Sequence, residues 1–396
     1  MLKDRKPVGA QKFPPLRCWI VLIFLLLAIS SGWKSGNLLA ADAKLAIQNV
    51  RLDRNVLISG ESVNLSFYLS RDAKTTVLIY GSNFEVIRRL MDQQPRTAGI
   101  NGVNWDGRDD SGRIVPDEAY LVSILAEGAN GERAVYDPTS FSGGEAFDIQ
   151  IQRIEESSGR YRIHYSVPYP SRISIQSGIH RGPLLKTVLD WKPMPSGNHV
   201  QTWDGMDETG RIRAIKEPGR IVYIKGFKLP ESSIIVQGST GDYASYYRNL
   251  KATPSDKINI LSFQSAKDNA LKRVEKGISQ NYLIQQSLNA APSFTVYLGK
   301  DRSMGLSERG VVAVSGQIDL TVEISPESLN SFNESRYEIV IFVDQRRFDE
   351  EEQAYSSHTY MLDTKQFSNG EHLITINLAS MNGQVSSYSF TLDVRN

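Results

Sequence analysis

From residue 44 onward the chain alternates apolar and polar residues in short runs rich in Val, Ile, Tyr and Phe, separated by Gly, Asn, Asp and Pro. Alternation with a period of two over about four to eight residues predicts half-buried β-strands, and the separating residues predict tight turns. The expected strands lie near residues 45–52, 63–69, 75–80, 84–90, 103–105 and 120–127, then 147–154, 161–167, 172–176, 185–189, 199–203 and 221–229, and finally 294–298, 311–314, 318–324, 337–343, 359–362, 372–378 and 388–394.

The strands fall into three groups, each of about seven strands in about 100 residues, which is typical of an immunoglobulin-like (Ig-like) sandwich. The sequence therefore predicts an all-β, multi-domain fold of antiparallel β-sandwiches with a short helical connector. We expect a signal peptide at 1–43, sandwiches at 44–140, 141–237 and 292–396, and a connector at 238–291.

An internal repeat supports this division. The sequence WDGRDDSGRI at 105–114 returns as WDGMDETGRI at 203–212. This period is too long for a solenoid unit of roughly 20 to 50 residues and matches a whole sandwich domain. The third group of strands has no Trp-Asp-Gly element, so only the first two sandwiches are expected to be copies of each other.

The repeated motif reads as a turn that is fixed by its own side chains. Asp-Gly after a strand is a hairpin signal because glycine tolerates positive φ, the following carboxylates accept backbone N–H bonds, and a second glycine closes the turn. The tryptophan before it is expected to be a core anchor. The motif residues are Trp105, Asp106, Gly107, Asp109 and Gly112, with Trp203, Asp204, Gly205, Asp207 and Gly210 in the second copy.

Calcium binding is the alternative interpretation of this motif. Asp106, Asp109 and Asp110 place three carboxylates within five residues, and carboxylate oxygens are the ligands that calcium prefers. Their spacing does not match an EF-hand loop, which has acidic residues at alternate positions and a distal Glu. We therefore favour the turn. The acidic run at 349–352 is interpreted as a solvated strand edge or loop.

The segment 101–116, which leads into the apolar run 120–122, resembles the Ig-like domain of the flagellar hook-capping protein, the FlgD type. The resemblance extends over roughly residues 45–235 and departs from the family pattern at Glu118, where the family has glycine, and at Ile221, where it has an aromatic residue. It implies an Ig-like module and carries no catalytic residues. The third group of strands resembles bacterial Ig-like domains of exported proteins.

The connector contains a second kind of pattern. Residues 265–277 begin with a capping box and carry apolar residues on one face, which predicts a helix of about three turns. Tyr243, Tyr246 and Tyr247 lie at helical spacing before it. They could form an aromatic interaction surface, but we favour packing against a neighbouring domain.

The first residues read as an export signal. Five basic residues precede the apolar run 19–29, which is shorter than the roughly 20 residues that cross a bilayer. We expect cleavage after Ala40, Ala41 or Ala43, with an uncleaved anchor as the alternative. A flagellar hook-capping protein is exported through a dedicated channel and does not begin with a cleavable signal peptide. We therefore do not expect this chain to have the hook-capping role. We expect a periplasmic, secreted or cell-surface protein without a membrane span in the mature chain.

Composition and motifs narrow the function. Removal of the signal peptide takes away the only cysteine, which argues against catalysis by a thiol. It leaves a chain whose net charge is close to zero, which argues against binding of nucleic acid. The five histidines show no zinc spacing, and no nucleophile elbow, Walker loop or dinucleotide fingerprint occurs. We expect no enzyme activity, no cofactor and no metal, although two glycosidase carboxylates remain compatible with the sequence. The expected partner is another envelope or surface protein. The alternatives are a glycan bound by Trp191 and the three tyrosines, or a role as accessory domains of an envelope enzyme.

Overall fold

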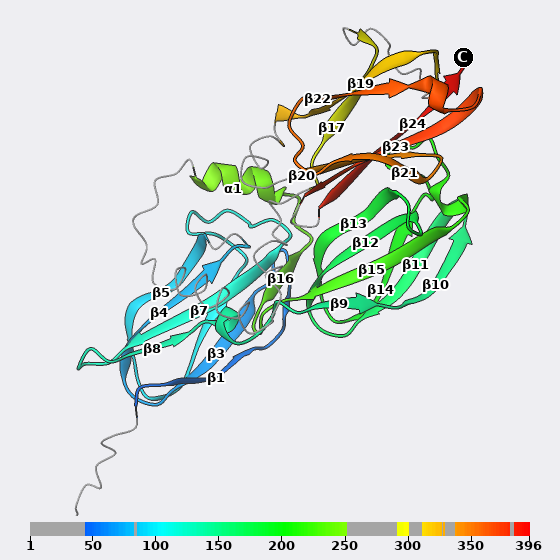
Figure 1. Cartoon of the computed structure of the whole chain (residues 1–396). Coiled ribbons are helices and arrows are strands. Elements are labelled where there is room, and N and C mark those ends of the chain that lie inside the picture. The colour runs from blue at the N-terminus through cyan, green and yellow to red at the C-terminus, as the bar shows by residue number, and fades with distance from the viewer. Residues whose placement is uncertain are drawn as a thin grey trace, which may run out of the picture. The chain divides into compact units, whose positions relative to one another are not determined.

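The computed structural model describes residues 44–82, 85–251, 291–300, 311–326, 328, 337–380 and 384–396. These residues form three β-sandwiches and one α-helix, as Figure 1 shows. The signal peptide expected at 1–43 and the helix expected at 265–277 lie outside the described residues. No helix in the described ranges is both long and apolar enough to cross a membrane.

The first sandwich packs two sheets around one core. One sheet has the order β1-β3-β6, and Val63, Leu65 and Phe67 on β3 alternate as buried positions, as the period of two predicts. The other has the order β2-β16-β7-β4-β5, with β8 beside β7. The strands before the second sandwich are β1 (Ile47–Leu52), β2 (Val56–Ile58), β3 (Val63–Leu69), β4 (Ala73–Tyr80), β5 (Val86–Arg96), β6 (Gly99–Trp105), β7 (Ala119–Glu127) and β8 (Arg133–Tyr136).

The second sandwich repeats this plan. Its sheets have the orders β10-β11-β14 and β13-β12-β15-β9, which correspond to β1-β3-β6 and β5-β4-β7 of the first. Trp105 pairs with Val63 across the first sheet, and Trp203 pairs with Tyr161 at the same place in the second. The strands are β9 (Ala146–Ile149), β10 (Ile151–Ser157), β11 (Arg160–Val167), β12 (Ser171–Ile179), β13 (Leu184–Met194), β14 (Gly197–Trp203) and β15 (Arg220–Lys228), and 3-10 turns occupy Pro138–Ser140 and Ala214–Lys216.

After the second sandwich the chain returns to the first. Strand β16 (Ile234–Gln237) pairs in parallel with β2 and antiparallel with β7, and helix α1 (Tyr243–Lys251) follows it. Ile234 and Val236 are buried in the core of the first sandwich. Residues 234–237 were expected to end the second domain at 141–237. In the structure the second sandwich is an insertion between β8 and the last strand of the first.

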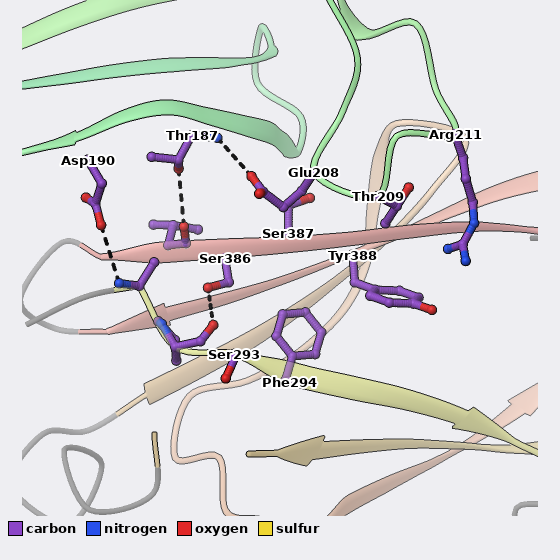
Figure 2. A pocket seen from close by; sticks show the side chains of 13 residues that line it. Thr187, Asp190, Glu208, Thr209, Arg211, Ser293, Phe294, Ser386, Ser387 and Tyr388 are labelled. Carbon is purple, nitrogen blue, oxygen red and sulfur yellow. Dashed lines mark hydrogen bonds between the residues drawn. The ribbon is translucent and has the colours of Figure 1, made fainter. Parts of the chain in front are cut away.

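The third sandwich has sheets of the orders β17-β19-β22 and β18-β24-β23-β20-β21. Strand β21 is an edge strand and carries Asp349 and Glu350, in agreement with the solvated-edge interpretation. The sandwich contacts the second one through β13 and β24, where Thr187 Oγ1 donates to the carbonyl of Val385 at 3.5 Å (Figure 2). The strands are β17 (Phe294–Leu298), β18 (Val311–Val314), β19 (Gln317–Ile324), β20 (Tyr337–Val343), β21 (Arg346–Glu351), β22 (His358–Asp363), β23 (Gly370–Ser380) and β24 (Val385–Val394), and a 3-10 turn occupies Thr364–Gln366.

Candidate docking sites at the repeated turns

The motif turn follows β6 and is closed by its own backbone. Arg108 and Ile114 form an isolated antiparallel bridge. Inside it, Asp109 N donates to Arg113 O at 2.9 Å, and Gly112 N donates to Asp109 O at 3.0 Å. The chain therefore reverses between Asp109 and Gly112, whereas the sequence analysis placed the two-residue turn at the Asp-Gly pair before them.

The first glycine of each motif has another structural reason. Gly107 and Gly205 have φ of +71° and +80°, in the left-handed region that glycine tolerates. A Cβ atom on Gly107 would lie 2.6 Å from the side chain of Leu57, and one on Gly205 would lie 2.6 Å from Tyr161. Both positions therefore require glycine for its backbone conformation and for close packing.

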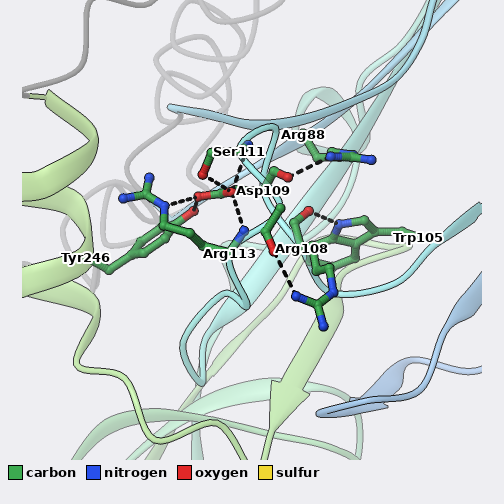
Figure 3. Close-up of polar contacts among 8 residues, drawn as sticks. Arg88, Trp105, Arg108, Asp109, Ser111, Arg113 and Tyr246 are labelled. Atoms are coloured by element: carbon green, nitrogen blue, oxygen red, sulfur yellow. Dashed lines mark hydrogen bonds and ion pairs between the residues drawn. The ribbon is translucent and has the colours of Figure 1, made fainter.

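Asp109 is the centre of the first turn and is only 1% exposed. Its Oδ1 accepts hydrogen bonds from Ser111 N, Ser111 Oγ and Arg113 N, and its Oδ2 accepts one from Arg113 Nε at 2.9 Å (Figure 3). Burial acts to raise the pKa of Asp109, but the hydrogen bonds from Ser111 and Arg113 outweigh it and lower this pKa below its ordinary value. The carboxylate fixes the turn and the direction of the arginine side chain.

The second turn repeats the tryptophan contact and the buried aspartate, but its closing backbone bond spans one residue more, from Asp207 N to Ile212 O at 2.8 Å. Trp203 Nε1 donates to Met206 O at 2.9 Å, as Trp105 Nε1 donates to Arg108 O at 2.9 Å in the first. The two indoles are 3% and 1% exposed, in agreement with the core-anchor interpretation. Asp207 accepts from the backbone N–H groups of the residues four and five positions later, both at 2.9 Å.

The acidic residues of the first turn are engaged by protein donors. Asp106 Oδ1 accepts from Arg108 N at 3.2 Å, and Asp110 Oδ1 accepts from Arg89 N at 2.9 Å. Within the described ranges, no group of three or more His, Cys, Asp or Glu side chains is placed to hold a metal ion. The carboxylates of the first motif therefore act as turn ligands for backbone N–H groups.

A tyrosine from helix α1 occupies the first turn. Tyr246 places its ring under the guanidinium of Arg113, with 5.5 Å from Cζ to the ring centroid, and its hydroxyl donates to Asp109 Oδ2 at 3.1 Å. Figure 3 shows this helix side chain pointing at the turn. Burial, followed by the charge of Asp109, raises the pKa of the Tyr246 hydroxyl, so Tyr246 remains a neutral donor.

A tyrosine from the third sandwich occupies the equivalent place on the second turn. Arg211 corresponds to Arg113 in the repeat and lies over the ring of Tyr388 on β24, at 5.6 Å. Its Nη1 also donates to the carbonyl of Ser389 at 3.3 Å. In both repeats the arginine after the closing glycine therefore holds a tyrosine from an element that follows in sequence. The sequence analysis missed this pairing because Tyr388 carries no local signal.

The three connector tyrosines do not form a free aromatic surface. Tyr243 is 5% exposed and belongs to the core of the first sandwich, where its hydroxyl donates to Glu85 and accepts from Ser82 N. Tyr246 and Tyr247 are partly buried and pack against the same core. The favoured interpretation, packing against a domain, is confirmed, and an exposed surface that includes Tyr243 is wrong.

A buried ion pair joins the first two sandwiches. Arg172 Nη2 on β12 donates to Glu118 Oε1 at 2.5 Å, and the two residues are 5% and 2% exposed. Glu118 Oε1 also accepts from Ala119 N at 2.6 Å. Glu118 is the position at which the family pattern has glycine, so this departure supplies a contact between domains.

A cleft of about 530 Å³ lies where the second turn meets the third sandwich. Figure 2 shows carboxylates, hydroxyl groups and two aromatic rings around it. Its lining residues are Thr187, Asp190, Glu208, Thr209, Arg211, Ala291, Pro292, Ser293, Phe294, Val385, Ser386, Ser387 and Tyr388.

Part of the chain is similar to a known Ig-like domain. The family model of the FlgD Ig-like domain matches residues 54–130, so this part of the first sandwich is similar to that domain. Among solved structures, FLGD from P. aeruginosa aligns at 18% identity over 29% of this chain and 84% of that chain, with a TM-score of 0.19. The fibronectin(III)-like modules of CbhA from Clostridium thermocellum align at 10% identity over 88% and 94%, with a TM-score of 0.18. The search of the curated proteins gave no match.

Proposed function

We propose that this chain is a non-enzymatic, exported protein of the cell envelope or surface whose Ig-like modules bind and assemble with another envelope protein. The observation that carries the proposal is the pair of turn docks, Arg113 with Tyr246 and Arg211 with Tyr388. Each repeat uses the same turn to capture a polypeptide element, so the motif acts as a protein-binding surface within the chain. The second dock joins the second and third sandwiches, and the first fixes helix α1 to the first sandwich.

The construction of the turn suits this role. The salt bridge from Arg113 Nε to Asp109 Oδ2, at 2.9 Å, fixes the direction of the guanidinium independently of the tyrosine. An arginine held in place loses less side-chain entropy when it stacks on an aromatic ring. Such a cation–π contact contributes about 0.5–1 kcal/mol at an exposed site. The dock is therefore specific but individually weak, which is suitable for the assembly of modules.

Two further observations support export and a binding role. The basic residues and the apolar run before residue 44 have the form of a signal peptide. The only cysteine, Cys18, lies within this segment, so the mature chain would contain no thiol that could be oxidised outside the cytoplasm. Ig-like sandwiches are common modules of surface proteins. N-terminal sequencing of the secreted or periplasmic protein should find the first residue just after Ala40, Ala41 or Ala43. A cytoplasmic chain that retains Met1 would contradict export.

Chemical crosslinking in whole cells tests the binding role. The tagged full chain is expected to crosslink to a distinct envelope protein, and the Arg211→Ala variant is expected to give less of this product because its third sandwich is held less firmly against the second. The exposed Arg346 on β21 is the matched control, and Arg346→Ala should crosslink like the parent. Absence of a crosslinked protein, or equal yields from all three chains, would overturn the proposal.

A further inference from the structure

We propose that the cleft between the second and third sandwiches binds a neutral saccharide, a function beyond protein assembly. The volume of about 530 Å³ lies within the range of about 300–1,000 Å³ that is common for small-molecule sites. Its walls come from β13 and the motif turn of the second sandwich, and from β17 and β24 of the third (Figure 2). The proposal rests on three features of these walls: their hydrogen-bonding capacity, their aromatic rings and their charge.

The hydroxyl groups of the cleft present mainly acceptor capacity. Ser387 Oγ donates to the carbonyl of Leu184 at 2.8 Å, and Ser386 Oγ donates to the carbonyl of Pro292. A hydroxyl that has given its proton to the protein keeps two lone pairs. These side chains can therefore accept hydrogen bonds from a ligand but have no proton left to offer.

The carboxylates add to this acceptor surface. Asp190 and Glu208 are exposed at the cleft. Asp190 Oδ2 accepts only a long bond of 3.4 Å from Ala291 N, and Glu208 Oε2 accepts one of 3.3 Å from Thr187 N. Both carboxylates have lone pairs available for stronger donors. The wall therefore suits a ligand that carries several O–H donors.

Two aromatic rings provide an apolar surface beside these acceptors. Phe294 and Tyr388 are partly buried, and their ring centroids lie 6.1 Å apart. The guanidinium of Arg211 lies over Tyr388 and stabilises its position. A pyranose combines a ring face of C–H groups with an equatorial set of hydroxyl groups, so it matches aromatic and acceptor surfaces side by side.

The charge of the cleft favours a neutral ligand over a cation. Arg211 lines the cleft, and Lys186, which is not one of the lining residues, places its Nζ 3.1 Å from Glu208 Oε1. These two cations balance Asp190 and Glu208. An ammonium ion or a metal ion would therefore gain no net charge neutralisation, whereas a polyol would use the lone pairs without any charge requirement.

Isothermal titration of the mature full chain tests the proposal with cellobiose, maltose, lactose and N,N′-diacetylchitobiose as probes. We expect at least one of them to bind with a Kd on the order of 1 mM or below. Asp190→Ala should weaken this binding at least about tenfold because it removes the least engaged acceptor. Asp92→Ala is the matched control at the equivalent position of the first repeat, and it should leave binding unchanged.

A second variant separates stacking from folding. Phe294→Leu keeps apolar volume in the cleft but removes the ring face, so it should weaken binding while the melting temperature stays close to that of the parent. Three results would overturn the proposal: no heat of binding from any of the four sugars at about 10 mM, equal affinity in Asp190→Ala and Asp92→Ala, or binding of lysine methyl ester in preference to all of the sugars.

Discussion

The buried ion pair between Glu118 and Arg172 gives the sharpest test of how the first two sandwiches are joined. Arg172→Met keeps much of the apolar stem but removes the guanidinium, which leaves the carboxylate of Glu118 at 2% exposure without its cation. Removing one partner of such a pair costs about 3–5 kcal/mol because the remaining charge is buried and uncompensated. This is a large part of the roughly 5–15 kcal/mol that stabilises a typical domain.

The double variant Arg172→Met with Glu118→Gln removes both charges. The glutamine oxygen can still accept the hydrogen bond from Ala119 N, which Glu118 Oε1 accepts at 2.6 Å. Replacing a buried pair by uncharged groups of similar volume is often nearly neutral. We therefore expect the double variant to be more stable than Arg172→Met alone, with a coupling energy of about 1–3 kcal/mol.

Urea unfolding followed by tryptophan fluorescence measures these free energies, and limited proteolysis between the sandwiches reports on their junction. Arg220→Met on β15 is the control because Arg220 is exposed. If Arg172→Met changes the free energy of unfolding by no more than the control, within about 0.5 kcal/mol, the pair does not stabilise the junction. Additive losses in the double variant would refute the coupling in the same way.

Three other perturbations test the turn and the returning segment. Trp105→Ala and Trp203→Ala should each lower the free energy of unfolding by about 3–5 kcal/mol, measured by calorimetry, and parent-like melting would contradict their role as core anchors. A chain that ends at residue 233 should melt well below one that ends at 251, because it lacks the strand and helix that fill the first core; equal melting would show that these elements are dispensable. The pKa of Asp109 is lowered in the folded state. Its ionised carboxylate therefore contributes to the free energy of unfolding above the unfolded pKa of about 3.9, and this contribution is lost as the pH falls through the folded pKa. At pH 7 the Asp109→Asn variant should therefore have a lower free energy of unfolding than the parent, and on acidification this free energy should fall less in the variant than in the parent. Parallel pH profiles of the free energy of unfolding for parent and variant would refute this.

Features with a local cause could be predicted from the sequence. Alternation along β3 and β11 reflects burial of one face, so it shows in the residues themselves. The motif glycines and tryptophans are also local, because backbone conformation and core burial select these residue types. The turn closed by the second glycine was expected from the acidic residues before it and is present between Asp109 and Gly112. The reversal expected at the preceding Asp-Gly pair was wrong, since the buried carboxylate of Asp109 decides where the chain turns and its burial is not visible in the sequence.

Contacts between distant segments could not be predicted in this way. Strand β16 is only four residues long, and its partners β2 and β7 precede it by more than 100 positions. Arg172 and Glu118 are 54 residues apart, and the sequence showed only a missing glycine at 118. Each residue of these pairs is unremarkable alone, because the stabilisation arises from the place where the fold brings them together.

We expect the two docks to differ in strength because their tyrosines contact the aspartate of the turn differently. In the first turn Asp109 Oδ2 accepts the hydroxyl of Tyr246, whereas in the second the corresponding Asp207 Oδ2 accepts the hydroxyl of Thr209 at 2.7 Å. The second tyrosine therefore docks through its ring and the arginine rather than through this carboxylate. Helix α1 is further secured by the burial of Tyr243.

Arginine variants should reveal this difference. Arg211→Ala is expected to loosen the third sandwich, with a small increase in the radius of gyration measured by small-angle scattering, because the ring contact and the bond to the carbonyl of Ser389 are both lost while the bonds between Leu184 and Asn377 remain. Arg113→Ala should leave the radius of gyration unchanged, since Tyr243 still fixes α1 to the first core. The same change in both variants, or in neither, would show that the equivalent arginines do not set the unequal strength of the two docks.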